Sequence, residues 1–237
     1  MSDFGNSEFT KVKDISGRRR MPRLGKIRLG AKVKKGDKEY PIELPFFLVP
    51  DEVAARYALG DTAWDRAVEL GVTRADVLRF VGDNGHRLAE KIPVMLPMDN
   101  LSAVFPQAYK RYGSSRGVKC IGNGERAREM EYDDKGRPAG SKEKDCPCNF
   151  LEAERPECKL NSTLNVMLPD VNVGGIYQIS LGSYNSTVDI NSGIDYAKSL
   201  IGRAAMVPFE LIRVPTITHG SGKKETHFTL QLRLSIP

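Results

Sequence analysis

Apolar and polar residues alternate most regularly at the end of the chain, where single polar residues separate Phe228, Leu230, Leu232 and Leu234. A period of two places alternate side chains on opposite faces of a strand, so the pattern predicts a strand over residues 225–236. Apolar runs bounded by turn-forming residues predict three more strands before it, over residues 164–168, 175–180 and 208–214.

A helix separates these strands into two pairs. Ile190, Ile194, Ala197 and Ile201 recur at spacings of four, three and four, which puts them on one helical face. Ser186 begins a capping pattern, so the helix is predicted over residues 186–201. The chain from residue 161 to residue 237 is therefore expected to form a β-β-α-β-β half, with the helix packed on an antiparallel sheet.

The first half of the chain mixes strands with helices. Basic Lys26 and Arg28 alternate with apolar Ile27 and Leu29, which predicts a strand with one basic face that ends in a hairpin at residues 35–37. Apolar runs predict buried strands at 44–49 and 92–96, and helical spacing predicts helices between residues 51 and 81. A further helix is expected to start at Asp99 or Asn100, because helical spacing relates Leu101, Val104, Phe105, Ala108, Tyr109 and Tyr112.

The predicted fold is α+β, with antiparallel sheets, packed helices and a four-cysteine loop, stapled by zinc, between two halves. Residues 1–17 are polar without a period and are expected to be a disordered tail. Residues 18–117 form the N-terminal α+β half with a basic arm, residues 118–160 the cysteine loop and residues 161–237 the C-terminal half.

Charge is unevenly distributed along the 237 residues. The net charge is +6, yet residues 1–38 carry twelve Lys or Arg against four Asp or Glu, which leaves the rest of the chain at −2. A basic end on a near-neutral body suggests contact with nucleic acid or an acidic protein surface, although a solubilising tail is also possible. The candidate basic arm consists of Arg18, Arg19, Arg20, Arg23, Lys26 and Arg28.

All four cysteines fall between residues 120 and 158, in the pattern C-x25-C-P-C-x9-C formed by Cys120, Cys146, Cys148 and Cys158. Four thiolates suit a tetrahedral structural zinc, and they leave no open position for a catalytic water. A metal would also offset the chain entropy of the charged, glycine-containing segment between them. The alternatives are ordinary thiols or two disulfides, and the polar segment 1–10 shows no signal peptide that would lead to an oxidising compartment.

No pattern in the sequence specifies catalysis, so the chain is expected not to be an enzyme. His86, His219 and His227 lie in no HExxH motif, and neither a G-x-S-x-G motif nor a phosphate-binding glycine loop occurs. No apolar run approaches 18 residues, so no membrane helix is expected. Tyr109 and Tyr112 lie among basic residues, a combination that can bind nucleic acid or simply pack in the core.

Six segments follow one another along the chain: Gly25–Gly30, Phe46–Pro50, Ile92–Pro97, Val104–Tyr109, Cys146–Cys148 with Cys158, and Gly175–Ile179 leading to Tyr184–Ser186. Together and in this order they resemble the phage recombination directionality factors that work with large serine integrases. The resemblance covers roughly residues 18–237. It implies a non-enzymatic accessory protein in the cytoplasm of a phage-infected or lysogenic bacterium, with the four cysteines as zinc ligands.

The resemblance also implies a partner. Such a factor would bind the coiled-coil and zinc-ribbon region of its integrase and redirect it from integration (attP with attB) to excision (attL with attR). It would reach DNA through the integrase, with direct contact at most weak, and it would need no membrane and no small-molecule substrate. The alternative is a single-strand or duplex nucleic-acid-binding or annealing protein of a phage or mobile element.

Overall fold

The computed structural model describes residues 21–113, 117–153, 156–220 and 223–235. The strands are β1 (Arg23–Lys35), β2 (Lys38–Leu48), β3 (Leu88–Ala89), β4 (Lys91–Met95), β5 (Gln107–Gly113), β6 (Gly117–Gly122), β7 (Arg126–Tyr132), β8 (Pro138–Asp145), β9 (Lys159–Leu168), β10 (Asn172–Leu181), β11 (Pro208–Gly220) and β12 (Lys223–Leu234). The helices are α1 (Asp51–Tyr57), α2 (Ala63–Glu69), α3 (Ala75–Asn84), α4 (Leu101–Val104), α5 (Asn149–Glu152) and α6 (Tyr184–Ile201), with short 3-10 turns at Gly60–Thr62 and Gly85–Arg87.

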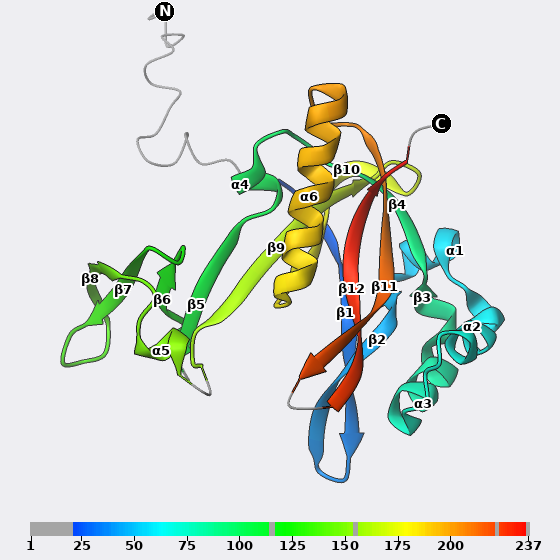
Figure 1. The fold of residues 1–237 in the computed structure, drawn as a ribbon, viewed down its shortest axis with the longest axis horizontal. Coiled ribbons are helices and arrows are strands. Elements are labelled where there is room, and N and C mark those ends of the chain that lie inside the picture. The colour runs from blue at the N-terminus through cyan, green and yellow to red at the C-terminus, as the bar shows by residue number, and fades with distance from the viewer. Residues whose placement is uncertain (1–20, 114–116, 154–155, 221–222, 236–237) are drawn as a thin grey trace, which may run out of the picture.

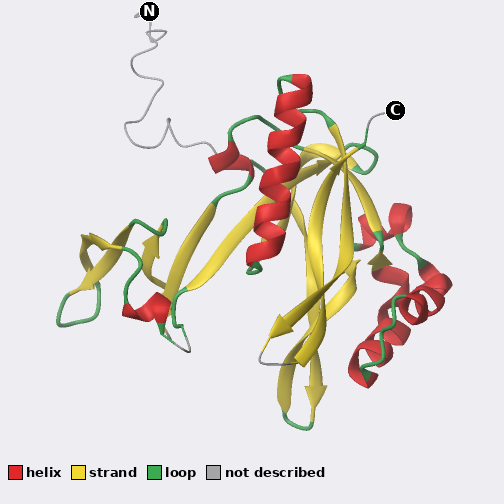
Figure 2. Ribbon diagram, viewed as in Figure 1, coloured by secondary structure: helices red, strands yellow, loops and turns green. Residues whose placement is uncertain are grey.

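One large sheet connects the strands in the order β3-β2-β1-β10-β9-β5-β6-β7-β8, and β4 links β9 to the β11–β12 hairpin. Strands from the two predicted halves are therefore neighbours where β1 meets β10, where β5 meets β9, and where β4 meets β9 and β11. The mixed α+β class is confirmed (Figures 1 and 2). The sheet is not wholly antiparallel, because β1 runs parallel to β10, with Arg23 beside Ile176 and Ile27 beside Ile179. A parallel pair requires a long crossover, and here most of the chain supplies it.

Two apolar clusters surround β2 on opposite sides. The main core lies between β9, β10, β11, β12 and α6, and its largest buried side chains include Phe105, Tyr177 and Phe209. The second cluster packs helices α2 and α3 against the other face of β2. Alternation along β2 explains the division, since Phe47 points into the main core while Phe46 points toward the helices.

The outer edge of β12 is closed by side chains rather than by another strand. Glu43 Oε1 accepts from the backbone N–H of Phe228 at 3.1 Å, and Ser186 Oγ accepts from that of Leu230 at 3.0 Å. Farther along, α6 comes so close that a Cβ on Gly193 would lie 2.2 Å from the backbone oxygen of Leu232. Edge strands invite unwanted pairing, and β2 with α6 prevents it here.

Most of the predicted strands are confirmed, but the helix expected from residue 99 to residue 112 is wrong beyond its first turn. Asn100 caps the short α4, with its Oδ1 accepting from Ala103 N at 3.3 Å. Pro106 has no backbone N–H and ends the helical ladder. Residues 107–113 instead form β5, which pairs with β9 and β6 on its two sides. Those tertiary backbone bonds override the helical spacing of the apolar residues.

The segment expected to be a long loop, residues 118–160, is also largely ordered. Its described residues form β6, β7 and β8 as an antiparallel meander, followed by the single-turn α5. Asn123 and Asp133 build the two turns by accepting backbone N–H groups on their side chains. The polar turn residues made the segment resemble a loop in composition, although in the structure they form the turns of hairpins.

Candidate partner-binding face and cysteine lobe

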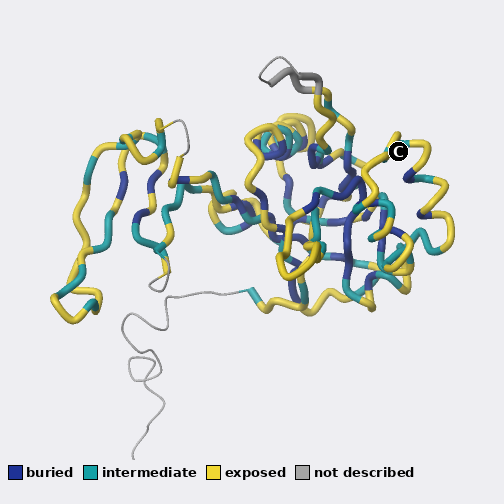
Figure 3. Tube along the Cα trace, turned by 90° about the horizontal axis from the view of Figure 1, so that it is seen from below, coloured by how far each residue is buried: buried dark blue, intermediate teal, exposed yellow. Residues whose placement is uncertain are grey.

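The meander and the cysteine-bearing segment after it project from the body as a separate region (Figure 1). We call residues 117–153 and 156–158, which include β6, β7, β8 and α5, the cysteine lobe. Figure 3 shows that buried positions gather in the body, whereas the lobe is mostly exposed or partly exposed. Its buried positions among the described residues are Cys120, Gly122, Ala127 and Cys158.

A row of charged side chains crosses one face of the lobe. Arg111 of β5 lies beside Cys120 of β6, which lies beside Glu129 of β7. Glu129 accepts from Arg111, and from Lys144 Nζ at 2.9 Å. The hydrogen bond from Lys144 is the main reason that the pKa of Glu129 is below its ordinary value, although burial opposes the shift. Arg111 also stacks on Phe150 of α5, 3.9 Å from the ring centre.

The four cysteines all lie in the cysteine lobe, and all are free thiols. Cys120 lies on β6, Cys146 and Cys148 follow β8, and Cys158 precedes β9. Burial raises the pKa of Cys158, and the thiols of Cys120, Cys148 and Cys146 raise it further while Arg111 lowers it. Gly122 leaves room for Cys146, because a Cβ there would lie 3.2 Å from Cys146 Sγ.

A metal site is not preformed by these thiols. No three or more His, Cys, Asp or Glu side chains in the described ranges are arranged to hold a metal ion. The donor chemistry nevertheless fits zinc. Burial and neighbouring thiols raise the pKa of Cys120 and of Cys158, and a divalent cation would favour their thiolate forms.

Only half of the predicted basic arm lies within the described residues. Arg18, Arg19 and Arg20 lie outside the described residues. Arg23, Lys26 and Arg28 are exposed on β1, within the sheet. Arg23 Nη1 donates to Gln178 Oε1 of β10 at 3.4 Å. These three residues are therefore part of a strand surface, as the alternation predicted, and not of a separate arm.

Helix α6 presents an uncovered apolar face to solvent. Its inner face buries Ile190, Ile194 and Ala197 against the main core. The cap of the helix is Ser183, whose Oγ accepts from Ser186 N at 3.3 Å, so the predicted cap at Ser186 was three residues late. On the outer face, the exposed large side chains are Tyr184 (68%), Val188 (42%), Tyr196 (60%) and Leu200 (57%).

These four outer residues share one ridge, with Ser192 completing the spacing of four between Val188 and Tyr196. We call Tyr184, Val188, Ser192, Tyr196 and Leu200 the α6 ridge. Ridges of this spacing fit into the grooves of another helix. Exposed tyrosines without charges are typical of the centre of a protein interface. The helix was predicted from its inner face alone, and the outer residues were missed although their spacing of four is visible in the sequence.

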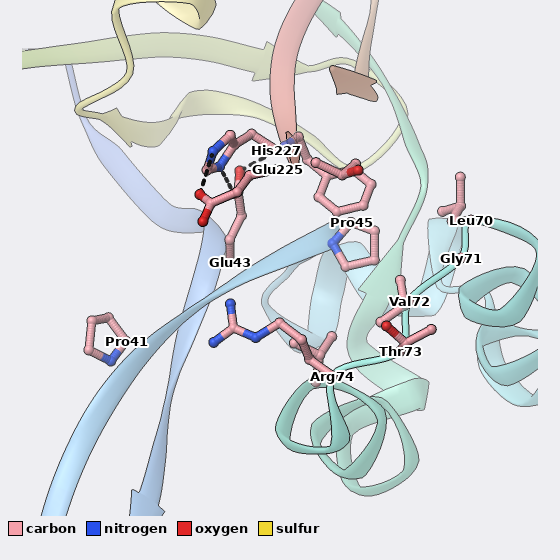
Figure 4. A pocket seen from close by; sticks show the side chains of 13 residues that line it. Pro41, Glu43, Pro45, Leu70, Gly71, Val72, Thr73, Arg74, Glu225 and His227 are labelled. Atoms are coloured by element: carbon pink, nitrogen blue, oxygen red, sulfur yellow. Dashed lines mark hydrogen bonds and ion pairs between the residues drawn. The ribbon is translucent and has the colours of Figure 1, made fainter. Parts of the chain in front are cut away.

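A groove of about 820 Å³ lies between β2, the start of β12 and the α2–α3 connection (Figure 4). His227 lies between two carboxylates, with Nδ1 3.4 Å from Glu43 Oε2 and Nε2 3.5 Å from Glu225 Oε2. Glu43 also accepts from Arg213 Nη2 at 2.8 Å, and Arg213 is buried. Glu43 thus joins β2 to β11 and β12, and its carboxylate is committed to structure.

Comparison with protein families identifies the chain. Residues 24–235 match the family described as Gp3-like, recombination directionality factor-like. The chain belongs to this family. The match includes the body and the cysteine lobe, so the resemblance noted in the sequence is confirmed over nearly its whole extent. No curated protein and no solved structure matches this directionality factor-like chain. Within the described ranges, none of its helices is long and apolar enough to cross a membrane.

Proposed function

We propose that this directionality factor-like protein binds a large serine integrase and switches it from integration (attP with attB) to excision (attL with attR). The family match over residues 24–235 is the observation that carries the proposal. A switch of direction needs no chemistry from the factor. It requires tighter binding to one arrangement of the recombinase complex than to the other, which shifts the equilibrium between them. Such a factor would act in the bacterial cytoplasm.

The α6 ridge is our candidate for the integrase contact. A regular ridge of residues spaced by four favours a helix as the occupant, and Ser192 at its middle allows a partner backbone to approach closely. The ridge residues themselves are uncharged and include two tyrosines, while exposed Asp195 lies beside Ser192 on the same face, so burial of the ridge would depend mainly on apolar area. We therefore assign to this ridge a helix from the coiled-coil region of the integrase.

The body beneath the ridge is rigidly supported, which suits a binding surface. Ser186 hydrogen-bonds to β12, Gly193 contacts the Leu232 backbone, and Gly202 ends the helix in the left-handed conformation at φ 81°. A preorganised helix loses little conformational freedom when a partner binds.

We also propose that the protein acts by binding and not by catalysis. In the groove near His227, the carboxylate of Glu43 is already engaged by Arg213 and by the Phe228 N–H. Because the Glu43 carboxylate is already bonded to these groups, it is not free to act as a general base, which must reach a substrate proton.

We further propose that Cys120, Cys146, Cys148 and Cys158 hold a structural zinc. The support is the small buried interior of the cysteine lobe, whose described buried positions are two thiols, one glycine and one alanine. A region with so little apolar burial needs another source of stability, and small domains commonly obtain it from a metal. When bound, zinc would fix the four thiolates and supply no reaction.

A recombination assay tests the function directly. The integrase encoded nearest to this gene is supplied with attL and attR or with attP and attB substrates, with and without the protein. The proposal expects excision only when the protein is present, and suppressed integration. No effect on either reaction, from a folded protein that anneals or binds DNA alone, would favour the alternative of a nucleic-acid-binding protein.

The α6 ridge is tested by a double variant, Tyr196→Ala with Leu200→Ala, in a pull-down with integrase. We expect binding to fall at least tenfold, because tyrosines at interface centres are often hot spots. The matched control is Val173→Ala with Ile217→Ala, which removes exposed apolar side chains elsewhere. Equal binding by the ridge variant and the control would exclude this helix as the contact.

A further inference from the structure

Acidic residues are absent from four neighbouring strands of the large sheet. Strands β1, β10, β9 and β5 lie side by side in that order. Together they contain nine Lys or Arg and no Asp or Glu, although the chain has 30 acidic residues. The next strand, β6, carries only Lys119, and β7 and β8 beyond it carry both signs. Lys32, Lys34 and Lys35 lie where β1 pairs with β2, and Lys32 forms an ion pair with Glu39 there. The region of a single sign of charge is therefore the part of these strands that holds the other six cations, whose potentials add up.

Register places four of the cations on one face. Ile27 is buried, so Lys26 and Arg28 on either side of it point outward, and both are exposed. On the other side of this region, Lys110 of β5 lies directly opposite Lys159 of β9. Helix α6 covers the reverse face of β9, where Ser162 Oγ meets Thr187 Oγ1 at 3.2 Å. We call the outer face with Lys26, Arg28, Lys110 and Lys159 the basic sheet face.

Amides and hydroxyls fill the space between these cations. Gln178 lies beside Lys26 and donates to Asn165 Oδ1 at 3.1 Å, while Lys110 Nζ donates to Asn161 Oδ1 at 2.9 Å. A hollow of about 510 Å³ opens at this face, lined by Lys110, Tyr112, Glu157, Lys159, Leu160, Asn161, Ser180, Leu181 and Gly182. Its one carboxylate, on Glu157, lies 3.6 Å from Arg111 Nη1.

We propose that the basic sheet face binds the phosphate backbone of duplex DNA. The surface is polar and positive without an apolar centre, which is typical of DNA interfaces and unlike the centre of protein interfaces. Lysine, arginine, amide and hydroxyl groups are the usual donors to phosphate oxygens. Three strand spacings, about 14 Å, separate β1 from β5, and the register places Lys26 level with Asn165 of β9 but Lys110 level with Lys159, about 20 Å farther along the strand. The two pairs of cations are thus spaced to contact phosphates at separate points along a duplex.

This proposal goes beyond integrase binding and is independent of it. The α6 ridge and the basic sheet face lie on opposite sides of β9, so one molecule could contact a protein partner and DNA together. Direct DNA contact would add affinity for the recombinase–DNA complex, and that part of the affinity would fall as salt rises.

Fluorescence anisotropy with a labelled 30-base-pair duplex that lacks attachment-site sequence tests the proposal with the protein alone. We expect binding at 50 mM salt in the range of nonspecific affinities, roughly 10⁻⁴ to 10⁻⁶ M or tighter. The variant Lys26→Glu with Arg28→Glu should bind at least tenfold more weakly, and its plot of log affinity against log salt should be shallower by about 1.8. Lys110→Glu with Lys159→Glu should have a similar effect.

The matched control is Lys135→Glu with Lys142→Glu, which makes the same change of net charge on the cysteine lobe, where both lysines are exposed. Wild-type-like binding by this control is expected. Equal weakening by control and test variants would overturn the proposal, as would no duplex binding by the wild-type protein or tighter binding of a single strand of the same length. Integrase binding without DNA, measured on the same variants, should stay unchanged. Absence of integrase binding by the wild-type protein would count against the proposed function and not against DNA binding by the basic sheet face.

Discussion

The body and the cysteine lobe are built from the same kind of antiparallel strands, yet their interiors differ. The body buries large side chains such as Phe105, Tyr177 and Phe209, which are nearly inaccessible to water. In the described part of the lobe, buried side chains are limited to those of Cys120, Ala127 and Cys158. Apolar burial contributes roughly 25 cal/mol per Å², so the body has an ample source of stability while the lobe has very little.

The comparison indicates that strand pairing alone does not explain the lobe. Backbone hydrogen bonds replace bonds to water and contribute only modestly to stability. The lobe adds a charged row of Arg111, Glu129 and Lys144, which is partly buried. Ion pairs of this kind contribute little net stability, because removing the charges from water offsets much of their attraction. We infer that the lobe depends on zinc, whereas the body should fold without it.

Zinc removal should therefore produce the largest difference between the two regions. Structural zinc in small domains contributes about 10–16 kcal/mol of apparent binding free energy. With a chelator, or in Cys148→Ser, we expect amide hydrogen exchange to become fast in residues 117–153 and to stay slow in β11 and β12. Metal analysis should find one zinc per chain in the wild-type protein. A metal-free protein with a protected lobe would refute the dependence.

Truncation in the main core should affect the body strongly. Phe209→Ala removes a buried aromatic ring from β11 and should lower the free energy of unfolding by about 3–5 kcal/mol. Ile121→Ala, in the exposed part of β6, should change it by less than about 0.5 kcal/mol. Denaturant titration of both variants measures the contrast. Comparable losses would mean that the lobe has an apolar interior after all.

A single methyl group should also separate the two regions. Gly193→Ala places a Cβ 2.2 Å from the Leu232 backbone oxygen and should cost about 1–3 kcal/mol, although Ala is the better helix former. In the lobe, a Cβ on Gly140 would come no closer than 3.6 Å to Glu131 Oε2, so Gly140→Ala should be nearly neutral. Thermal unfolding of the Gly193→Ala and Gly140→Ala variants, each compared with the wild-type protein, measures the difference. A stabilised Gly193→Ala would show that α6 can move away from β12.

The smallest effect concerns the acid side of the pH profile. The pKa of Glu129 is lowered in the folded lobe, so its contribution is present at neutral pH and is lost as pH falls through that lowered pKa. Glu129→Gln should lower the free energy of unfolding of the lobe by less than about 1 kcal/mol at pH 7. The difference between this variant and the wild-type protein should vanish in acid. Hydrogen exchange in β7 at several pH values measures it. A difference that grows in acid would contradict the assignment.

Periodicity along the chain predicted most strands and the long helix, because their periods reflect burial on one face. The alternation from Phe228 to Leu234 and the helical spacing from Ile190 to Ile201 predicted β12 and α6 without any tertiary information. The six sequence segments and their order along the chain also indicated the family, and the family match over residues 24–235 confirms it. The cysteine pattern indicated where burial would be insufficient.

Which elements become neighbours depends on the packing of the whole chain. Residues 107–113 have helical spacing, but pairing with β9 and β6 on both sides makes them a strand. The parallel contact of β1 with β10 brings together strands about 150 residues apart, and it alone creates the basic sheet face. Local periodicity records how one segment is buried. It holds no information about which distant segment covers it, and that choice is made when the whole chain packs.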